Sequence, residues 1–202
     1  MIMRSSSIFQ LQHEVFMNRY IRVGGDFLQV YDLETMKALL NTNDTIGAVL
    51  RIHFCCEHII DLWCNKITSN EDFFDFGRTN FSMKVSIAKK LGLSAEIAAF
   101  LKNINNLRNS FAHETNFVIS NQKLDDMRHL VDQIPSYGSQ SIPKINDPSW
   151  EGLLDDRRIS WNMNDITIIE RLVLIYYTFS MKVLSVFNQE FAERGVSFSY
   201  SD

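Results

Sequence analysis

Apolar residues recur at helical spacing along most of this chain. Between positions 44 and 66 they return every three or four residues, which is the spacing of an amphipathic α-helix. Asp44 directly precedes this stretch and is a favoured N-cap residue. The pattern therefore predicts a helix from Asp44 to about Lys66, with this apolar set: Ile46, Val49, Leu50, Phe54, Ile59, Ile60, Leu62 and Trp63.

The same spacing predicts further helices. One runs from Phe81 to Leu91 and ends at Gly92, a residue that readily adopts the left-handed cap. Ser94 caps the next helix, whose apolar stripe reaches Phe111. Two more helices are predicted over residues 124–134 and over residues 165–194.

Two regions lack a clear helical period. Residues 20–31 fit either a small hairpin turning at Gly24-Gly25 or a loop with flanking helical turns, and Asp32 then starts a short helix through Leu40. All three prolines of the chain fall within residues 135–148, so residues 135–164 are predicted to form a long connection with one short helix from Ser149.

Composition supports an all-α protein. The 202 residues include only 8 glycines and 3 prolines, and 46% of them are hydrophobic, which is enough for one sizeable core. We expect an antiparallel helical bundle over residues 44–202, with a long loop before the last helix. Residues 1–43 form an N-terminal arm with a short helix, in one domain overall.

Net charge and cysteine content indicate the class of protein and its cellular compartment. A net charge of -4 argues against a chain that is basic throughout, as dedicated nucleic-acid binders usually are. The three cysteines lie within one predicted helix, which disfavours a disulfide framework and indicates a reducing cytoplasm. The most apolar stretch is ten residues long, too short to cross a bilayer, so no membrane contact is expected.

One short motif contains side chains that could act in catalysis: Arg108-Asn109-Ser110-Phe111-Ala112-His113. A helical projection at about 100° per residue places Arg108 on the flank of the buried face. Asn109 and His113 are four residues apart and share a polar face. Because a buried arginine needs an acidic partner, the best candidate is Glu57, which lies among apolar residues of the first predicted helix.

This motif resembles the signature of the HEPN superfamily of helical bundles, in which an arginine and a polar residue precede a histidine near the end of a helix. The stretch from Lys84 to Gly92, followed by Leu-Arg-x-x-x-x-His, also resembles the MltR family of mannitol-operon regulators, which is itself HEPN-like. The resemblance covers roughly residues 44–134.

The HEPN resemblance implies a metal-independent endoribonuclease that acts as a homodimer, with toxin or antiphage defence roles and an antitoxin or regulatory protein as a partner. His113 would act as general base or acid, Arg108 would stabilise the charged phosphorane, and Asn109 would orient the phosphate or the imidazole. The product would carry a 2′,3′-cyclic phosphate. Thr115 stands where nucleotidyltransferase-paired toxins often carry a modified tyrosine, which argues against that one partnership.

A local excess of basic residues around the motif favours RNA. Lys84, Lys89, Lys90 and Lys102 are the expected RNA contacts. The MltR resemblance implies instead a non-catalytic factor of transcription regulation that works through protein contacts, and a nucleotide-binding sensor is a third possibility. In a purely structural alternative, Arg108 pairs with Glu57 and the polar pair holds a helix end.

Neither a metal nor another cofactor is expected. His53 and Glu57 are four residues apart, but they lack a third ligand at suitable spacing, and the cysteines lack the CxxC spacing of zinc sites.

Overall fold

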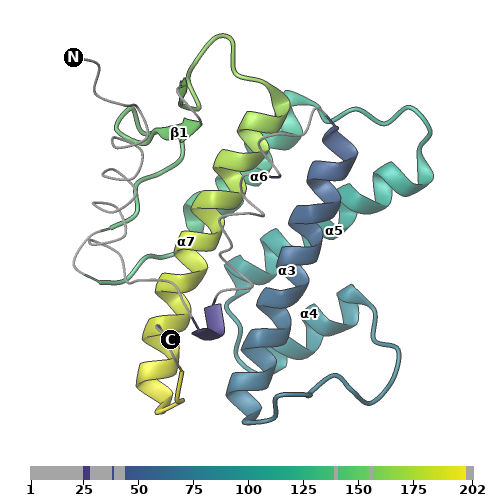
Figure 1. Ribbon diagram of the computed structural model, residues 1–202, viewed down its shortest axis with the longest axis vertical. Coiled ribbons are helices and arrows are strands. Elements are labelled where there is room, and N and C mark those ends of the chain that lie inside the picture. Colours follow the sequence, from purple (N-terminus) through teal and green to yellow (C-terminus); the bar gives the residue numbers. More distant parts are fainter. Residues whose placement is uncertain (1–24, 28–37, 39–43, 139–140, 155–156, 199–202) are drawn as a thin grey trace, which may run out of the picture.

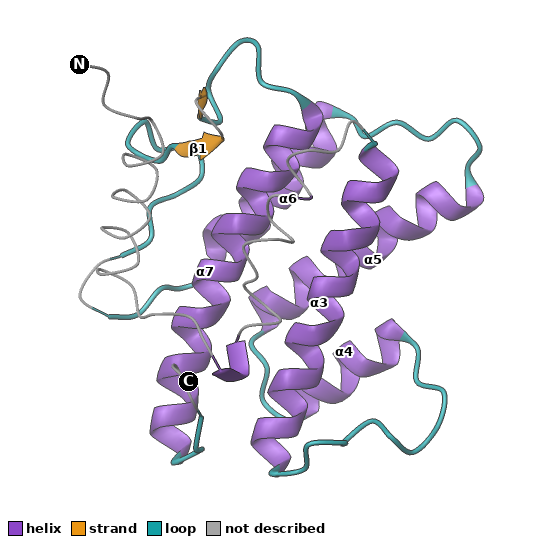
Figure 2. Cartoon of the chain, in the orientation of Figure 1, coloured by secondary structure: helices purple, strands orange, loops and turns teal. Residues whose placement is uncertain are grey.

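The computed structural model describes residues 25–27, 38, 44–138, 141–154 and 157–198. This part of the chain is helical, as predicted, apart from one small hairpin (Figures 1 and 2). The elements in chain order are the 3-10 turn η1 (Gly25–Phe27), α3 (Thr45–Thr68), α4 (Phe81–Lys90), α5 (Ala95–His113), α6 (Asn121–Gln133), β1 (Gly152–Leu154), β2 (Arg157–Ile159) and α7 (Ile168–Arg194). Most of the predicted N-terminal hairpin and of the helix from Asp32 to Leu40 lies outside the described residues.

The predicted helix starts at Asp44 and Ser94 are confirmed by their caps, whereas α7 begins three residues after the predicted start because Thr167 caps it. The Asp44 carboxylate accepts from Ile46 N at 3.0 Å, and the Ser94 hydroxyl accepts from Ile97 N at 3.2 Å. Helix α6 begins three residues before the predicted start because Ser120 caps it. Each cap satisfies a backbone N–H that has no partner within its helix, which fixes where the helix begins.

The long helices pack in a bundle around one core. Helices α3 and α7 run side by side, with α5 and α6 behind them and α4 against α3 and α5 (Figure 1). Trp63 of α3 packs on Phe187 and Phe191 of α7, and Phe100 of α5 lies 4.1 Å from Phe179 of α7 between ring centroids. The apolar stretch within α7 is buried, as predicted. None of the helices in the described part of the chain has the length and apolar character needed to cross a bilayer.

The predicted helix from Ser149 is wrong. Ser149 lies in a turn in which the Asp147 carboxylate accepts from both its N–H and its hydroxyl, and an antiparallel hairpin follows instead (Figure 2). Gly152 pairs with Ile159 in this hairpin. A Cβ at Gly152 would come within 3.2 Å of Ile159 Cγ1 and 3.3 Å of Leu174 Cδ2, so the glycine lets the hairpin lie close against α7.

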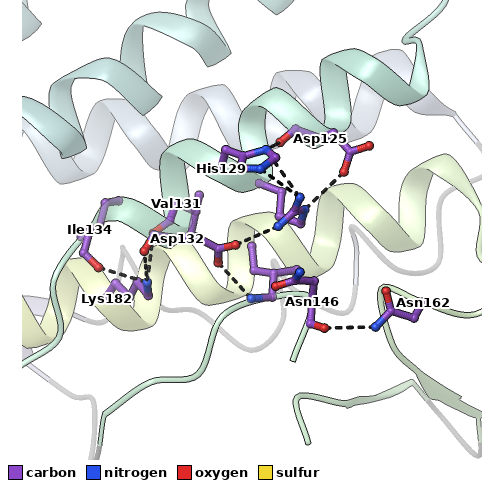
Figure 3. A network of polar contacts seen from close by, with 10 residues as sticks. Asp125, His129, Val131, Asp132, Ile134, Asn146, Asn162 and Lys182 are labelled. Carbon is purple, nitrogen blue, oxygen red and sulfur yellow. Dashed lines mark hydrogen bonds and ion pairs between the residues drawn. The ribbon is translucent and has the colours of Figure 1, made fainter. Parts of the chain in front are cut away.

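A polar network ties the 135–164 connection to α6 and α7 (Figure 3). The Asp132 carboxylate accepts from Ile145 N at 2.9 Å and from Arg128 Nη1 at 3.0 Å. Lys182 of α7 donates to backbone carbonyls at the end of α6. The connection is therefore anchored to α6 by a part-buried hydrogen bond at Ile145, and Lys182 joins α7 to the end of α6.

Candidate functional site

The Arg108–His113 motif lies in the last turns of α5, which extend beyond α3 (Figure 1). Arg108 is exposed, so the expected burial of this residue is wrong. Its guanidinium Nη1 donates to Asn109 Oδ1 at 3.2 Å. The described residues include no carboxylate within ion-pair distance of Arg108, so its charge faces solvent.

The exposure of Arg108 follows from where α4 begins. Asn105 Nδ2 donates to Ser82 Oγ at 3.3 Å, in the first turn of α4. Helix α4 therefore covers α5 only up to the level of Asn105. Arg108 lies one helical turn further on, beyond the N-terminal end of α4.

The expected pairing of Arg108 with Glu57 is also wrong. Lys84 of α4 takes that carboxylate: its Nζ lies 2.9 Å from Glu57 Oε1 and 2.9 Å from Asp61 Oδ1. Burial alone would lower the pKa of Lys84, but its hydrogen bonds to Asp61 and Glu57 outweigh burial and raise it. Lys84 thus joins α4 to α3 and does not contribute a free charge for RNA.

The polar pair of the motif lies as predicted on one side of α5. Asn109 is half-buried and His113 is exposed in the last turn. Within the described part of the chain, no hydrogen bond or ion pair engages His113. Its imidazole is therefore open to a substrate or a partner.

The remaining predicted RNA contacts divide between two places. Lys102 is exposed and lies on the same face of α5 as Asn109 and His113, at spacings of seven and eleven residues. Lys89 and Lys90 are exposed in the last turn of α4, at the opposite end of that helix from Ser82. Only Lys102 thus shares a surface with the motif.

The structure adds a histidine that sequence analysis considered only as a metal ligand. His53 of α3 lies with Nε2 3.3 Å from Asn105 Oδ1, and its ring packs on Phe81 at 4.2 Å between centroids. Burial lowers the pKa of His53 and Arg108 lowers it further, against the opposing effects of Asn105 and Glu57. His53, Asn105 and Ser82 come from three different helices, so no local sequence pattern could have grouped them.

The described residues contain no group of three or more His, Cys, Asp or Glu side chains that could hold a metal ion. All three cysteines are buried as free thiols. Neither observation adds a chemical group to the site.

An exposed apolar row borders the site on α3. Ile46, Leu50 and Phe54 are 47%, 48% and 62% exposed, and their spacing of four residues places them along one side of the helix. Met83 of α4 is also exposed. Leu50 is three residues from His53, so the two side chains are neighbours on the surface of α3.

No protein-family model, curated protein or solved structure gives a significant match to the chain. A functional inference therefore rests on the motif and on the geometry of the residues around it.

Proposed function

We propose that this chain is a metal-independent endoribonuclease of the HEPN type, with Arg108, Asn109 and His113 as its working residues. The observation that carries the proposal is the state of the arginine. Arg108 stands exposed at the end of α5, next to Asn109, without a carboxylate partner in the described part of the chain. An uncompensated guanidinium on the same helix end as an accessible imidazole suits a phosphodiester ligand.

The reaction needs three functions from these groups. The ribose 2′-hydroxyl attacks the adjacent phosphorus, and the charge that develops on the phosphorane oxygens is stabilised by the fork of Arg108. His113 transfers a proton, and Asn109 orients Arg108 through their hydrogen bond. The leaving 5′-oxygen departs and the RNA retains a 2′,3′-cyclic phosphate.

The proposal includes a homodimer that forms across the α3 apolar row. Ile46, Leu50 and Phe54 are large, exposed apolar side chains on one side of α3, a feature that often marks a contact surface. A second copy seated there would lie next to the Arg108 surface, because both surfaces adjoin His53. A two-fold contact of this kind brings two motifs into one neighbourhood.

The second candidate function is a non-catalytic MltR-like regulator that works through protein contacts. One observation favours the regulator. Lys84 forms ion pairs with two carboxylates, so the basic surface near the motif is smaller than the sequence suggests. In that case the α3 apolar row is the functional surface and the motif is not catalytic.

An RNA cleavage assay in the presence of EDTA separates the two functions. The chain, an Arg108→Ala/His113→Ala variant and a control are each incubated with a structured RNA, and the product ends are analysed. Arg158→Ala/His129→Ala is a matched control because it removes an exposed arginine and an exposed histidine away from the motif. We expect cyclic phosphate ends from the chain and the control only. Equally intact RNA in all three samples would favour the regulator.

A further inference from the structure

Three side chains from three helices form a hydrogen-bonded chain beside Arg108. Ser82 of α4 accepts from Asn105 of α5, and Asn105 in turn contacts His53 of α3, with both distances at 3.3 Å. The His53 ring packs on Phe81 of α4. The two contacts, with Asn105 and with Phe81, hold the imidazole between α5 and α4.

The orientation of the Asn105 amide assigns the proton of His53 to Nε2. Asn105 directs its Nδ2 group to Ser82, so its oxygen faces His53. A carboxamide oxygen can only accept a hydrogen bond, and His53 Nε2 must therefore donate. In the neutral ring, Nδ1 then carries the lone pair, and no hydrogen bond to Nδ1 is found within the described part of the chain.

Burial favours the neutral ring of His53. It is the largest effect on the pKa of His53 and lowers it, and Arg108 of α5 adds a smaller effect in the same direction, whereas the Asn105 hydrogen bond raises the pKa. Glu57 of α3 acts in the opposite direction, but Lys84 of α4 holds that carboxylate in an ion pair. A neutral imidazole whose Nε2 contacts an amide and whose Nδ1 has no hydrogen bond in the described part of the chain has the arrangement of a general base held by an orienting amide.

His53 also lies close to where a phosphate would bind. Arg108 is one helical turn beyond Asn105 on α5, about 4.5 Å further along the helix axis. His113 is eight residues beyond Asn105, about 12 Å along the same axis. Along the axis of α5, Arg108 is therefore nearer to the level of Asn105 than to that of His113, which lies five residues or about 7.5 Å beyond Arg108.

We infer that His53 is the general base of this site, positioned by Asn105 and Ser82, and that His113 is left with the role of general acid. This inference rests on the proposed ribonuclease function. His53 Nδ1 accepts the proton of the ribose 2′-hydroxyl while its oxygen bonds to phosphorus. The bond from phosphorus to the 5′-oxygen breaks, and that oxygen takes a proton from the His113 imidazolium.

The test compares cleavage rates across pH for the chain and two variants. His53→Gln keeps an N–H donor for Asn105 but removes the base, and it should slow cleavage about 100-fold or more. His58→Gln is the matched control, because His58 is the other histidine of α3 and instead contacts Phe54 edge-on. The control should cleave at the rate of the unmodified chain.

Asn105→Asp keeps the ring and supplies an independent readout. A carboxylate on Nε2 stabilises the imidazolium, so the pKa of His53 should rise and the acid limb of the pH–rate profile should move to higher pH. A histidine that serves only packing would not move that limb. Circular dichroism checks that both variants remain folded. If His53→Gln does not fold, the pH–rate profile of Asn105→Asp alone tests whether His53 is the general base.

The outcomes separate the two proposals. If the chain cleaves RNA, the Arg108→Ala/His113→Ala variant does not, and both His53→Gln and Asn105→Asp retain the original rate and pH profile, then the role of His53 is overturned while the ribonuclease stands. If the chain itself does not cleave RNA, both are overturned. Loss of activity in His53→Gln together with a shifted acid limb in Asn105→Asp supports the role of His53.

Discussion

The ammonium group of Lys182 on α7 lies 3.0 Å from the carbonyl oxygen of Ile134, just past the end of α6. The same Nζ lies 3.0 Å from Val131 O and 3.3 Å from Asp132 O (Figure 3). These carbonyls lie at the end of α6, where backbone oxygens are short of partners within the helix, although Val131 O also accepts from Ile134 N. Lys182 is only 3% exposed, so its side chain acts as a buried cap on α6.

Replacing Lys182 with methionine should lower the free energy of unfolding by about 3 kcal/mol, because the change strands buried carbonyl groups at little cost in packing. Urea denaturation followed by circular dichroism measures this effect. Lys144→Met removes an exposed lysine of the connection and is the matched control, with an expected change within about 0.5 kcal/mol. Equal stability of the two variants would show that Lys182 does not cap α6.

Arg108→Ala should leave the free energy of unfolding within about 0.5 kcal/mol of its original value, because Arg108 is exposed and bonds only a neighbouring amide. Arg128→Ala is the contrasting variant. Arg128 is buried, pairs with Asp125 and Asp132, and lies over the ring of Trp161, so its loss should cost about 3 kcal/mol. A large loss of stability in Arg108→Ala would indicate a structural role for the motif.

Lys84→Met should destabilise the fold by about 2 kcal/mol, because it leaves Glu57 and Asp61 without the cation that lies between them. The pKa of Lys84 is higher in the folded state than its unfolded value of about 10.5. The contribution of Lys84 to the free energy of unfolding is therefore present in full below the unfolded pKa and is lost only as the pH rises through the folded pKa. The difference between Lys84→Met and the unmodified chain should therefore be the same at about pH 7 and about pH 9.

Lys102→Met, an exposed lysine of α5, is the control for Lys84→Met and should leave stability nearly unchanged. Denaturation at both pH values gives the comparison. A Lys84→Met effect no larger than that of Lys102→Met would mean that the ion pairs with Glu57 and Asp61 add nothing measurable to stability.

The thiols should be unreactive in the native chain. Burial raises the pKa of Cys64 to about 12, with a further rise from Asp61 and an opposing effect of Lys84, and burial likewise raises the pKa of Cys56. An aromatic disulfide reagent at about pH 8 should therefore react with all three cysteines only after unfolding. Rapid reaction under native conditions would contradict the burial of this part of α3.

Leu50→Glu should convert a dimer into a monomer, because it introduces a charge in the middle of the α3 apolar row. Arg51→Glu is the control, since Arg51 is an exposed neighbour that points to another side of α3. Light scattering after size-exclusion chromatography measures the oligomeric state. A monomeric unmodified chain, or a Leu50→Glu variant that remains dimeric, would rule out this row as the contact between copies.

The positions of the principal helices could be predicted from the sequence because the determinants are local. Asp44 and Ser94 cap the helices that directly follow them, and the apolar period of each helix reflects the one face that it buries. The last helix also ends as predicted, with Arg194 followed by Gly195 in the left-handed conformation.

Only the tertiary structure decided which residues meet across the bundle. The hairpin after Ser149 depends on the fit of Gly152 against Leu174 of α7, a contact between segments that sequence periodicity does not register. Arg108 projects onto the buried flank of α5, but it is exposed because α4 begins at Phe81 and does not extend over it. A helical projection gives the direction of a side chain about its own axis, whereas exposure depends on where the neighbouring helix ends.

The same distinction between local sequence and tertiary packing applies to the candidate site. The sequence alone determined that Arg108, Asn109 and His113 lie on consecutive turns near the end of one helix, because spacing along a helix is set by its backbone hydrogen bonds. Only the tertiary structure shows that Glu57 pairs with Lys84 and that His53 contacts Asn105. Residues 52 positions apart in the chain meet only through packing of the whole core. Burial of apolar surface brings segments together regardless of their separation in the sequence.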